Sequence, residues 1–139
     1  MASRSLKDLL PQVQLKAEEF FQLCADNGRD VLIYCTQRSK EEQDVLYAQG
    51  RTISGKIVTN ARGGYSWHNF GRAFDFVPLI AGKPQWDNSV LYSRCGRLAE
   101  EIGLEWAGRW TGRLREVAHL QYTNGISIDQ ARKNDNHKM

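Results

Sequence analysis

The sequence predicts an α+β domain in which helices pack on one side of a small antiparallel sheet. Helical patterns lie early in the chain and most of the short β-rich segments lie late, an order typical of α+β folds. A chain of 139 residues also favours one domain with a single core. We therefore expect one domain over residues 1–139, with its core at about 11–132 and a flexible polar tail at 133–139.

Caps and apolar spacing define the amino-terminal elements. Ser5 is placed to cap a short helix, which Pro11 ends or restarts. The β-rich segment 30–36 predicts a buried strand. Between them, a helix ending near residue 27 is predicted from an apolar stripe at three- and four-residue steps: Val13, Ala17, Phe20, Phe21 and Cys24.

Two further helices are predicted from their first residues. The segment 39–48 begins with Ser39 and carries Glu42 three residues later, which is a capping-box pattern. Asn88 or Ser89 can cap the other helix. Its apolar stripe is expected to comprise Leu91, Cys95, Leu98 and Ile102.

The rest of the chain combines a long loop with short strands. Residues 50–65 hold four glycines among polar residues, and loops of this length in a compact domain are commonly functional. Residues 73–77 alternate as a strand that puts Asp75 on the opposite face from Phe74 and Phe76. The remaining elements are short: strands at 104–106 and 118–122 and a helical turn after Ser127.

Composition excludes several classes of protein. The net charge of +3, from 19 basic and 16 acidic residues, is too small to indicate a nucleic-acid partner. The apolar runs are too short to span a bilayer, so no stable membrane association is expected, and the first residues lack the apolar core of a secretory signal. The three cysteines are odd in number and widely spaced, which predicts reduced, partly buried thiols at Cys24, Cys35 and Cys95.

The segment 66–75 carries the chemistry. His68 follows the glycine-rich loop, and Asp75 lies seven residues later, while Gly71 lets the chain turn so that both side chains converge. Both are good zinc ligands, and His119 is the candidate for the third ligand that a catalytic zinc site needs. A hydrogen-bonded structural histidine is the alternative. A carboxylate in an apolar strand is costly unless it is paired or metal-bound, which favours the metal site.

This segment resembles the S-x-H-x-x-G-x-A-x-D signature of zinc peptidases that cleave peptidoglycan stem peptides. They include D-alanyl-D-alanine carboxypeptidases and phage L-alanyl-D-glutamate endopeptidases, and the hedgehog signalling domain is a fold relative. The segment 106–119 is similar to the family's W-G-G-x-W and acid-x-x-His block, and residues 37–52 resemble the helix and loop of the phage endolysins. The resemblance covers residues 11–122 and matches all five fixed positions of the signature: Ser66, His68, Gly71, Ala73 and Asp75.

The resemblance implies a hedgehog/D-Ala-D-Ala-peptidase-like fold and one zinc ion held by His68, Asp75 and His119. It makes Glu116 the base that takes a proton from a water activated by zinc, for attack on the L-alanyl-D-glutamate bond. Arg38 becomes the anchor for a substrate carboxylate, which its guanidinium can bind bidentately. The alternative for Arg38 is a solvated residue at a helix start.

Other positions have less definite roles. Ser66 hydrogen-bonds substrate or orders its loop, with both roles left open, and Gln43 supports either a neighbouring site residue or the fold. Ala107 and Arg109 depart from the family pattern near the expected site. These two departures leave the substrate preference open.

The expected activity is therefore that of a phage-type endolysin. We expect a monomer that is made in the bacterial host cytoplasm and reaches the wall after a breach of the membrane. One alternative is a D-alanyl-D-alanine carboxypeptidase with the same site, and the endolysin-like loop at 50–52 argues against it. The other is a non-catalytic zinc- or wall-binding module, for which Glu116 would have no use as a base.

Overall fold

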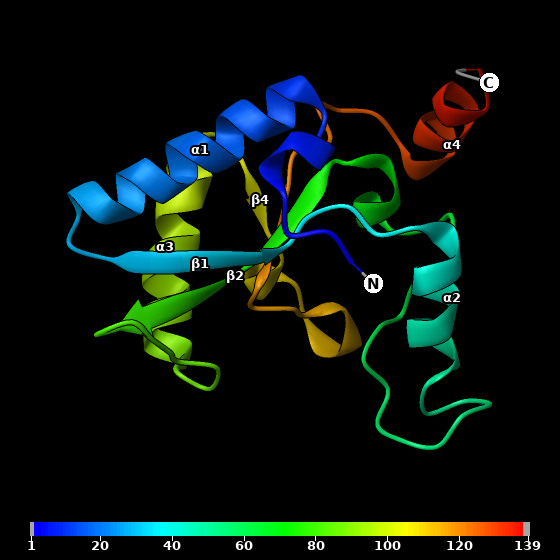
Figure 1. The fold of residues 1–139 in the computed structure, drawn as a ribbon, viewed down its shortest axis with the longest axis horizontal. Helices are drawn as coiled ribbons and strands as arrows, with labels where there is room; N and C mark the ends of the chain where they lie inside the picture. Colours follow the sequence, from blue (N-terminus) through cyan, green and yellow to red (C-terminus); the bar gives the residue numbers. More distant parts are fainter. Residues whose placement is uncertain (1, 138–139) are drawn as a thin grey trace.

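A small antiparallel sheet forms the centre of the molecule in the computed structural model, which describes residues 2–137 (Figure 1). Its strands run in the order β1-β2-β5-β4, and β3 pairs with the far end of β2. The strands are β1 (Asp30–Cys35), β2 (Ala73–Ile80), β3 (Lys83–Pro84), β4 (Glu105–Trp106) and β5 (His119–Gln121).

The predicted helices are present with small shifts in their bounds. The Ser5 hydroxyl caps the first short helix, Ser39 and Glu42 form the expected capping box, and the Asn88 side chain accepts a hydrogen bond from Leu91 N. The α-helices are α1 (Pro11–Asp26), α2 (Lys40–Ala48), α3 (Ser89–Glu101) and α4 (Ile128–His137). Short 3₁₀ turns are η1 (Leu6–Asp8), η2 (Trp67–Phe70), η3 (Ala107–Arg109) and η4 (Gly112–Leu114). None of the helices in this described range is long and apolar enough to cross a bilayer.

An aromatic core holds α1 and α3 against one face of the sheet (Figure 1). The Phe20 ring of α1 lies 5.2 Å from that of Phe76 on β2, and the Phe76 ring lies 5.5 Å from that of Tyr92 on α3. Because side chains alternate along a strand, Asp75 points to the opposite face from Phe74 and Phe76, as predicted. The three cysteines are reduced and buried, which also confirms the prediction.

The buried faces of α1 and α3 differ in part from the predicted stripes. Phe21 is 50% exposed, because it lies about 100° around the helix from the fully buried Phe20. The buried face of α3 centres on Tyr92 rather than on Leu91. Its position is set by Gly96, where an added Cβ would lie 2.3 Å from the Trp106 ring. The missing side chain lets the indole pack on the helix backbone, a contact that apolar periodicity does not reveal.

The last helix is also longer than predicted. The sequence indicates one turn after Ser127, followed by a tail from residue 133, whereas α4 continues to His137. Ser127 Oγ accepts a hydrogen bond from Gln130 N, and Gln130 Oε1 accepts one from Ser127 N. This reciprocal cap satisfies two backbone groups at the start of the helix. Residues 138–139 of the predicted tail lie outside the described residues.

The neighbouring phenylalanines of α1 provide a test of this packing. Replacing the buried Phe20 with Ala leaves a cavity between α1 and β2 and should lower the free energy of unfolding by about 3–5 kcal/mol. Phe21→Ala should cost less than about 1 kcal/mol, because half of that side chain already contacts solvent. Urea denaturation of both variants measures the difference. Similar losses would contradict the assigned orientation of α1.

Candidate metal centre and active-site cleft

The pairing of β2 with β5 brings the first two candidate ligands together. Asp75 and His119 are direct partners across the two strands, as are Ala73 and Gln121. Partners in an antiparallel pair project from the same face of the sheet. His119 Nδ1 consequently lies 3.4 Å from Asp75 Oδ1.

The 3₁₀ turn η2 positions His68, the third candidate. Ser66 Oγ accepts a hydrogen bond from His68 N, and the Asn69 side chain accepts one from Ser66 N. Gly71 ends the turn in the left-handed conformation with φ 65°, where an added Cβ would lie 3.1 Å from Leu10 N. The turn is followed at once by β2, so that His68 Nε2 comes to 3.1 Å from Asp75 Oδ1.

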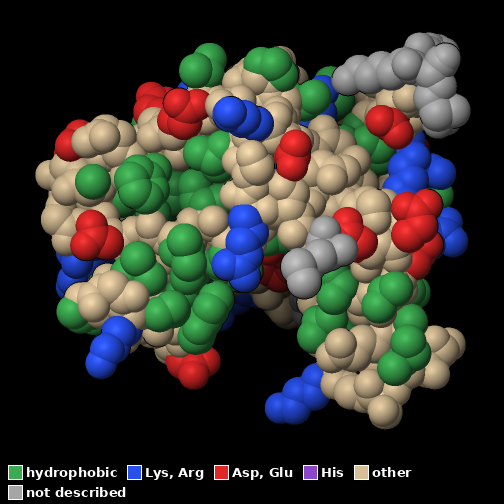
Figure 2. All heavy atoms as spheres, viewed as in Figure 1, with side chains coloured by type: hydrophobic (Ala, Val, Ile, Leu, Met, Phe, Trp, Pro, Cys, Tyr) green, Lys and Arg blue, Asp and Glu red, His purple; other side chains and the backbone are tan. Residues whose placement is uncertain are grey.

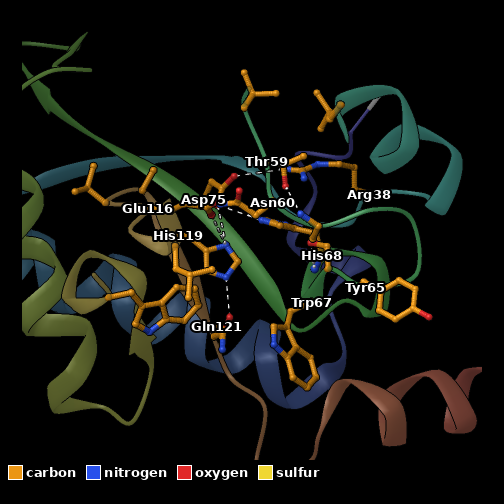
Figure 3. Close-up of a pocket in the computed structure, with 18 of the residues that line it drawn as sticks. Arg38, Thr59, Asn60, Tyr65, Trp67, His68, Asp75, Glu116, His119 and Gln121 are labelled. Carbon is orange, nitrogen blue, oxygen red and sulfur yellow. Dashed lines mark hydrogen bonds and ion pairs between the residues drawn. The ribbon is translucent and has the colours of Figure 1, made fainter. Parts of the chain in front are cut away.

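The outer nitrogen of each imidazole is held by an acceptor, and Figure 3 shows the bond between His119 and Gln121. His68 Nδ1 lies 2.7 Å from the Thr36 carbonyl oxygen, and His119 Nε2 lies 2.8 Å from Gln121 Oε1. A neutral imidazole that donates through these nitrogens keeps the lone pair on the other one. The lone pairs then lie on His68 Nε2 and His119 Nδ1, the two atoms beside Asp75, and this is how histidine ligands of metals are commonly oriented.

The distances from Asp75 to the two imidazoles fit a zinc site. Zinc ligands at about 2.0–2.1 Å in a tetrahedral site lie about 3.3 Å from one another, and the nitrogens of His68 and His119 lie 3.1 and 3.4 Å from Asp75 Oδ1. Burial opposes the charge on Asp75, but His68 and His119 outweigh it and hold the pKa of the carboxyl well below its usual range. Burial likewise disfavours a charged His68, yet the Asp75 carboxylate raises the pKa of this imidazole to about 10, so that without a metal Nε2 carries a proton that zinc would displace. The buried carboxylate therefore attracts cations.

Cys35 provides a possible alternative ligand, since ligand atoms of Cys35, His68 and Asp75 lie within 4.8 Å of one another. A β-bulge places it there: Ile33 pairs with Phe76 and Cys35 pairs with Asp75, so β1 has one extra residue. However, the Cys35 thiol lies 3.9 Å from His68 Nδ1, the nitrogen held by the Thr36 carbonyl. Cys35 thus lies beside the bonded nitrogen of His68, whereas His119 Nδ1 lies beside Asp75 Oδ1, which favours His119 as the third ligand.

Arg38 is built into the same cluster. Its Nη1 donates to Gln43 Oε1 at 2.7 Å, its Nη2 donates to Cys35 Sγ at 3.3 Å, and Nη2 lies 3.6 Å from Asp75 Oδ2. The side chain is only 12% exposed, so the alternative of a solvated residue is wrong. Gln43 is fully buried and donates to the Ala61 carbonyl oxygen and to Thr59 Oγ1. It therefore connects Arg38 to the end of the long loop.

Glu116 faces the same cluster from the open side. Its Oε2 lies 3.8 Å from His119 Nδ1, and its side chain is 42% exposed. Glu116 and the cluster that it faces line a cleft of about 570 Å³, from which Gln43 and Cys35 are absent. Figure 2 shows the molecule hollowed between α2 with its following loop and the rest of the protein. The lining includes Arg38, Ser66, His68, Asp75, Glu116, His119 and Gln121, with walls formed by Tyr34, Val58, Trp67 and Trp110.

Ala107 and Arg109, the two departures from the family pattern, do not line this cleft. Ala107 is buried beneath it, and the Arg109 guanidinium pairs with Glu100 of α3 at 2.8 Å. The Ala107 carbonyl oxygen nevertheless accepts hydrogen bonds from Glu116 N and Trp110 N, two residues of the lining, so Ala107 lies near the site as expected. Gln121, in contrast, was not predicted as a site residue. Its position two residues after His119 on a strand is the signal that could have identified it.

Comparison with known proteins identifies the family of this chain. Residues 59–122 match the M15 peptidase family model described as D-alanyl-D-alanine carboxypeptidase. The chain is 40% identical over 123 residues to the peptidoglycan L-alanyl-D-glutamate endopeptidase CwlK of Bacillus subtilis. This match covers 82% of this chain and 73% of that enzyme. The chain belongs to the M15 peptidase family. Both the predicted family and the predicted enzyme class are thereby confirmed.

Two further similar proteins extend the comparison. The L-alanyl-D-glutamate peptidase of Listeria phage A118 is 30% identical over 125 residues, and the match covers 86% of this chain but only 41% of the phage protein. The crystal structure of the Serratia marcescens L-Ala D-Glu endopeptidase ChiX superposes with a TM-score of 0.63 at 21% identity, covering 88% of this chain and 89% of that one. The structural likeness confirms the predicted fold.

The metal centre leads to a graded prediction. The purified protein should hold about one zinc per chain, and His68→Ala, Asp75→Ala or His119→Ala should each abolish tight binding. Gln121→Met should lower zinc affinity by about 10- to 100-fold, because it removes the acceptor that orients His119. Competition with a fluorescent chelator measures the affinities.

Thr123→Val is the matched control. Thr123 donates a hydrogen bond to Glu105, as Gln121 does, but it does not hold His119. Its zinc affinity should equal that of the parent. A Gln121→Met variant that binds zinc as tightly as the parent would show that this bond does not orient the ligand. Tight binding by all three ligand variants would contradict the assigned site.

Proposed function

We propose that this M15 peptidase is a zinc-dependent, phage-type endolysin that hydrolyses the L-alanyl-D-glutamate bond of peptidoglycan stem peptides. The observation that carries the proposal is the convergence of two imidazole nitrogens on one buried carboxylate in an open cleft, with Glu116 beside them. The names of the bacterial and phage relatives support the choice of bond. The D-alanyl-D-alanine carboxypeptidase in the family description is the second candidate.

Three side chains would hold the metal, and a fourth would move the proton. Zinc at His68, Asp75 and His119 would act as a Lewis acid that polarises the scissile carbonyl and acidifies a water. Glu116 would accept the proton of the attacking water and pass it to the leaving amine. Its carboxylate lies near His119 Nδ1 but remains partly exposed, so it is free to exchange protons with substrate and solvent.

Arg38 would bind the carboxylate that defines the stem peptide. Its guanidinium is fixed by Gln43 and Cys35 on the inner side and lines the cleft close to Asp75. A fixed guanidinium binds a carboxylate with little loss of side-chain entropy. The endopeptidase and the carboxypeptidase would then differ in which carboxylate Arg38 binds: that of D-glutamate or that of a terminal D-alanine.

The place of synthesis and the place of action are proposed from the sequence. We propose synthesis in the cytoplasm of a bacterial host and action on the wall after a breach of the membrane, as a monomer. The resemblance of residues 37–52 to phage endolysins and the phage relative support this setting.

Digestion of purified peptidoglycan tests both the enzyme class and the bond. Mass spectrometry should show stem peptides released with a new amino-terminal D-glutamate, whereas a carboxypeptidase would release only D-alanine. Glu116→Gln should keep zinc and lower the rate by at least about 100-fold, because it keeps the size of the side chain and removes its basicity. Near-parental activity of this variant would exclude Glu116 as the base. Binding of wall by the parent with no product would favour the non-catalytic module.

Arg38→Lys provides a second kinetic prediction. Lysine keeps the charge but cannot form the fork of bonds to Gln43, Cys35 and a carboxylate, so kcat/KM should fall by about 10- to 100-fold. Zinc content should stay at the parental level. Arg72→Lys is the control, because Arg72 donates to the Thr123 carbonyl oxygen outside the cleft lining. Equal effects of the two changes would assign Arg38 a purely structural role.

A further inference from the structure

An exposed tryptophan lies next to the cleft. Trp86 follows the short strand β3 and is 53% exposed. Its ring packs edge-to-face on that of Tyr34, with centroids 5.1 Å apart and an interplanar angle of 76°. A large aromatic ring left half in water contributes little to the core, and the contact with Tyr34 fixes its orientation. Trp86 therefore presents an aromatic surface to solvent.

A second hollow of about 570 Å³ surrounds this ring and is lined by residues 84–89. Apart from Trp86 and Pro84, its lining consists of hydrogen-bonding side chains: Gln85, Asp87, Asn88 and Ser89. Asp87 is the one acidic side chain in this lining and no basic side chain is part of it, so the hollow suits a neutral, polar ligand better than an anion. The lining combines an aromatic face with amides, a carboxylate and a hydroxyl.

The segment around the hollow is held at both ends. Gln85 N donates to the Pro78 carbonyl oxygen at 2.8 Å, and Leu91 N donates to the Asn88 side chain at 3.1 Å. The hollow is consequently formed before any ligand binds, which lowers the entropic cost of binding. In Figure 1 this segment follows the β2–β3 end of the sheet, on the other side of the molecule from α2 and the long loop.

Tyr34 joins this hollow to the cleft. Tyr34 lines the cleft and its ring contacts that of Trp86, which lines the second hollow, so this aromatic pair connects the two. Tyr34 is the extra residue at the β-bulge of β1, between Ile33 and Cys35. A ligand that extends from the cleft past Tyr34 would meet the Trp86 ring next.

Building on the proposed function, we propose that Trp86 and the hollow of residues 84–89 bind a sugar of the glycan strand that carries the stem peptide in the cleft. A pyranose ring presents C–H groups that pack on an aromatic face, and N-acetylated sugars present hydroxyls and amides to polar side chains. The stem peptide is covalently attached to the glycan, so peptide binding in the cleft holds the sugar at a high effective concentration nearby. The chemistry and the position both fit this occupant.

Paired substrates test this site. Trp86→Ala should lower kcat/KM by about 3- to 10-fold on a disaccharide-linked stem peptide, mainly through KM, and leave it unchanged on the same peptide without sugar. Trp86→Phe should restore most of the loss. Phe21→Ala, which removes another half-exposed aromatic on α1, should change neither value. An equal effect of Trp86→Ala on both substrates, or no effect on either, would overturn the sugar site.

A binding measurement separates this inference from the proposed function. Calorimetric titration with a tetramer of N-acetylglucosamine needs no catalysis, so it remains valid if the parent cleaves neither substrate. Weaker binding to Trp86→Ala than to the parent and to Phe21→Ala would support the sugar site. Equal binding to all three proteins, or no binding to the parent, would overturn it, whatever peptide bond the enzyme cleaves.

Discussion

The largely buried carboxylate of Asp75 is the constraint on which the rest of the site depends. A charge on the central strand is costly unless partners compensate it. The compensation comes from three separate segments, since Arg38, His68 and His119 all converge on its two oxygens. The aromatic core on the other face of β2 fixes the orientation of this strand, and therefore of the carboxylate. A site gathered from residues 38 to 119 is in this way tied to one register of the sheet.

Much of this arrangement could be predicted because local patterns encode it. The capping box at Ser39, the alternation around Asp75 and the turn that ends at Gly71 are short-range features, and all three appear as expected. The misses depend on contacts between distant segments. Phe21 fits the apolar stripe of α1 but has no partner surface, and the buried face of α3 is set by Trp106 packing on Gly96. Periodicity alone cannot place such contacts.

Gln43 shows how a polar core residue links the long loop to the site. Residues 51–58 are exposed, and the loop returns to the body of the protein near Thr59 and Ala61. The buried Gln43 amide holds it there while its oxygen holds Arg38. A fully bonded buried amide favours one geometry, because any shift leaves a polar atom without a partner. Gln43 thereby fixes the position of the loop wall of the cleft relative to the Arg38 guanidinium. The sequence alone left open whether Gln43 supports a site residue or the fold, and the structure shows that it does both.

Exposure separates the groups suited to hold a metal from the group suited to react. His68 and His119 are 2% and 6% exposed, and the Asp75 side chain is 15% exposed, whereas that of Glu116 is 42% exposed. Metal ligands gain from rigidity and from a surrounding of low dielectric constant. The outer bonds to Thr36 and Gln121 provide the rigidity. A base must exchange protons and meet substrate, so it needs the open side of the cleft. A module that only stored zinc would need the first property and not the second, and this gradient is the structural argument for catalysis.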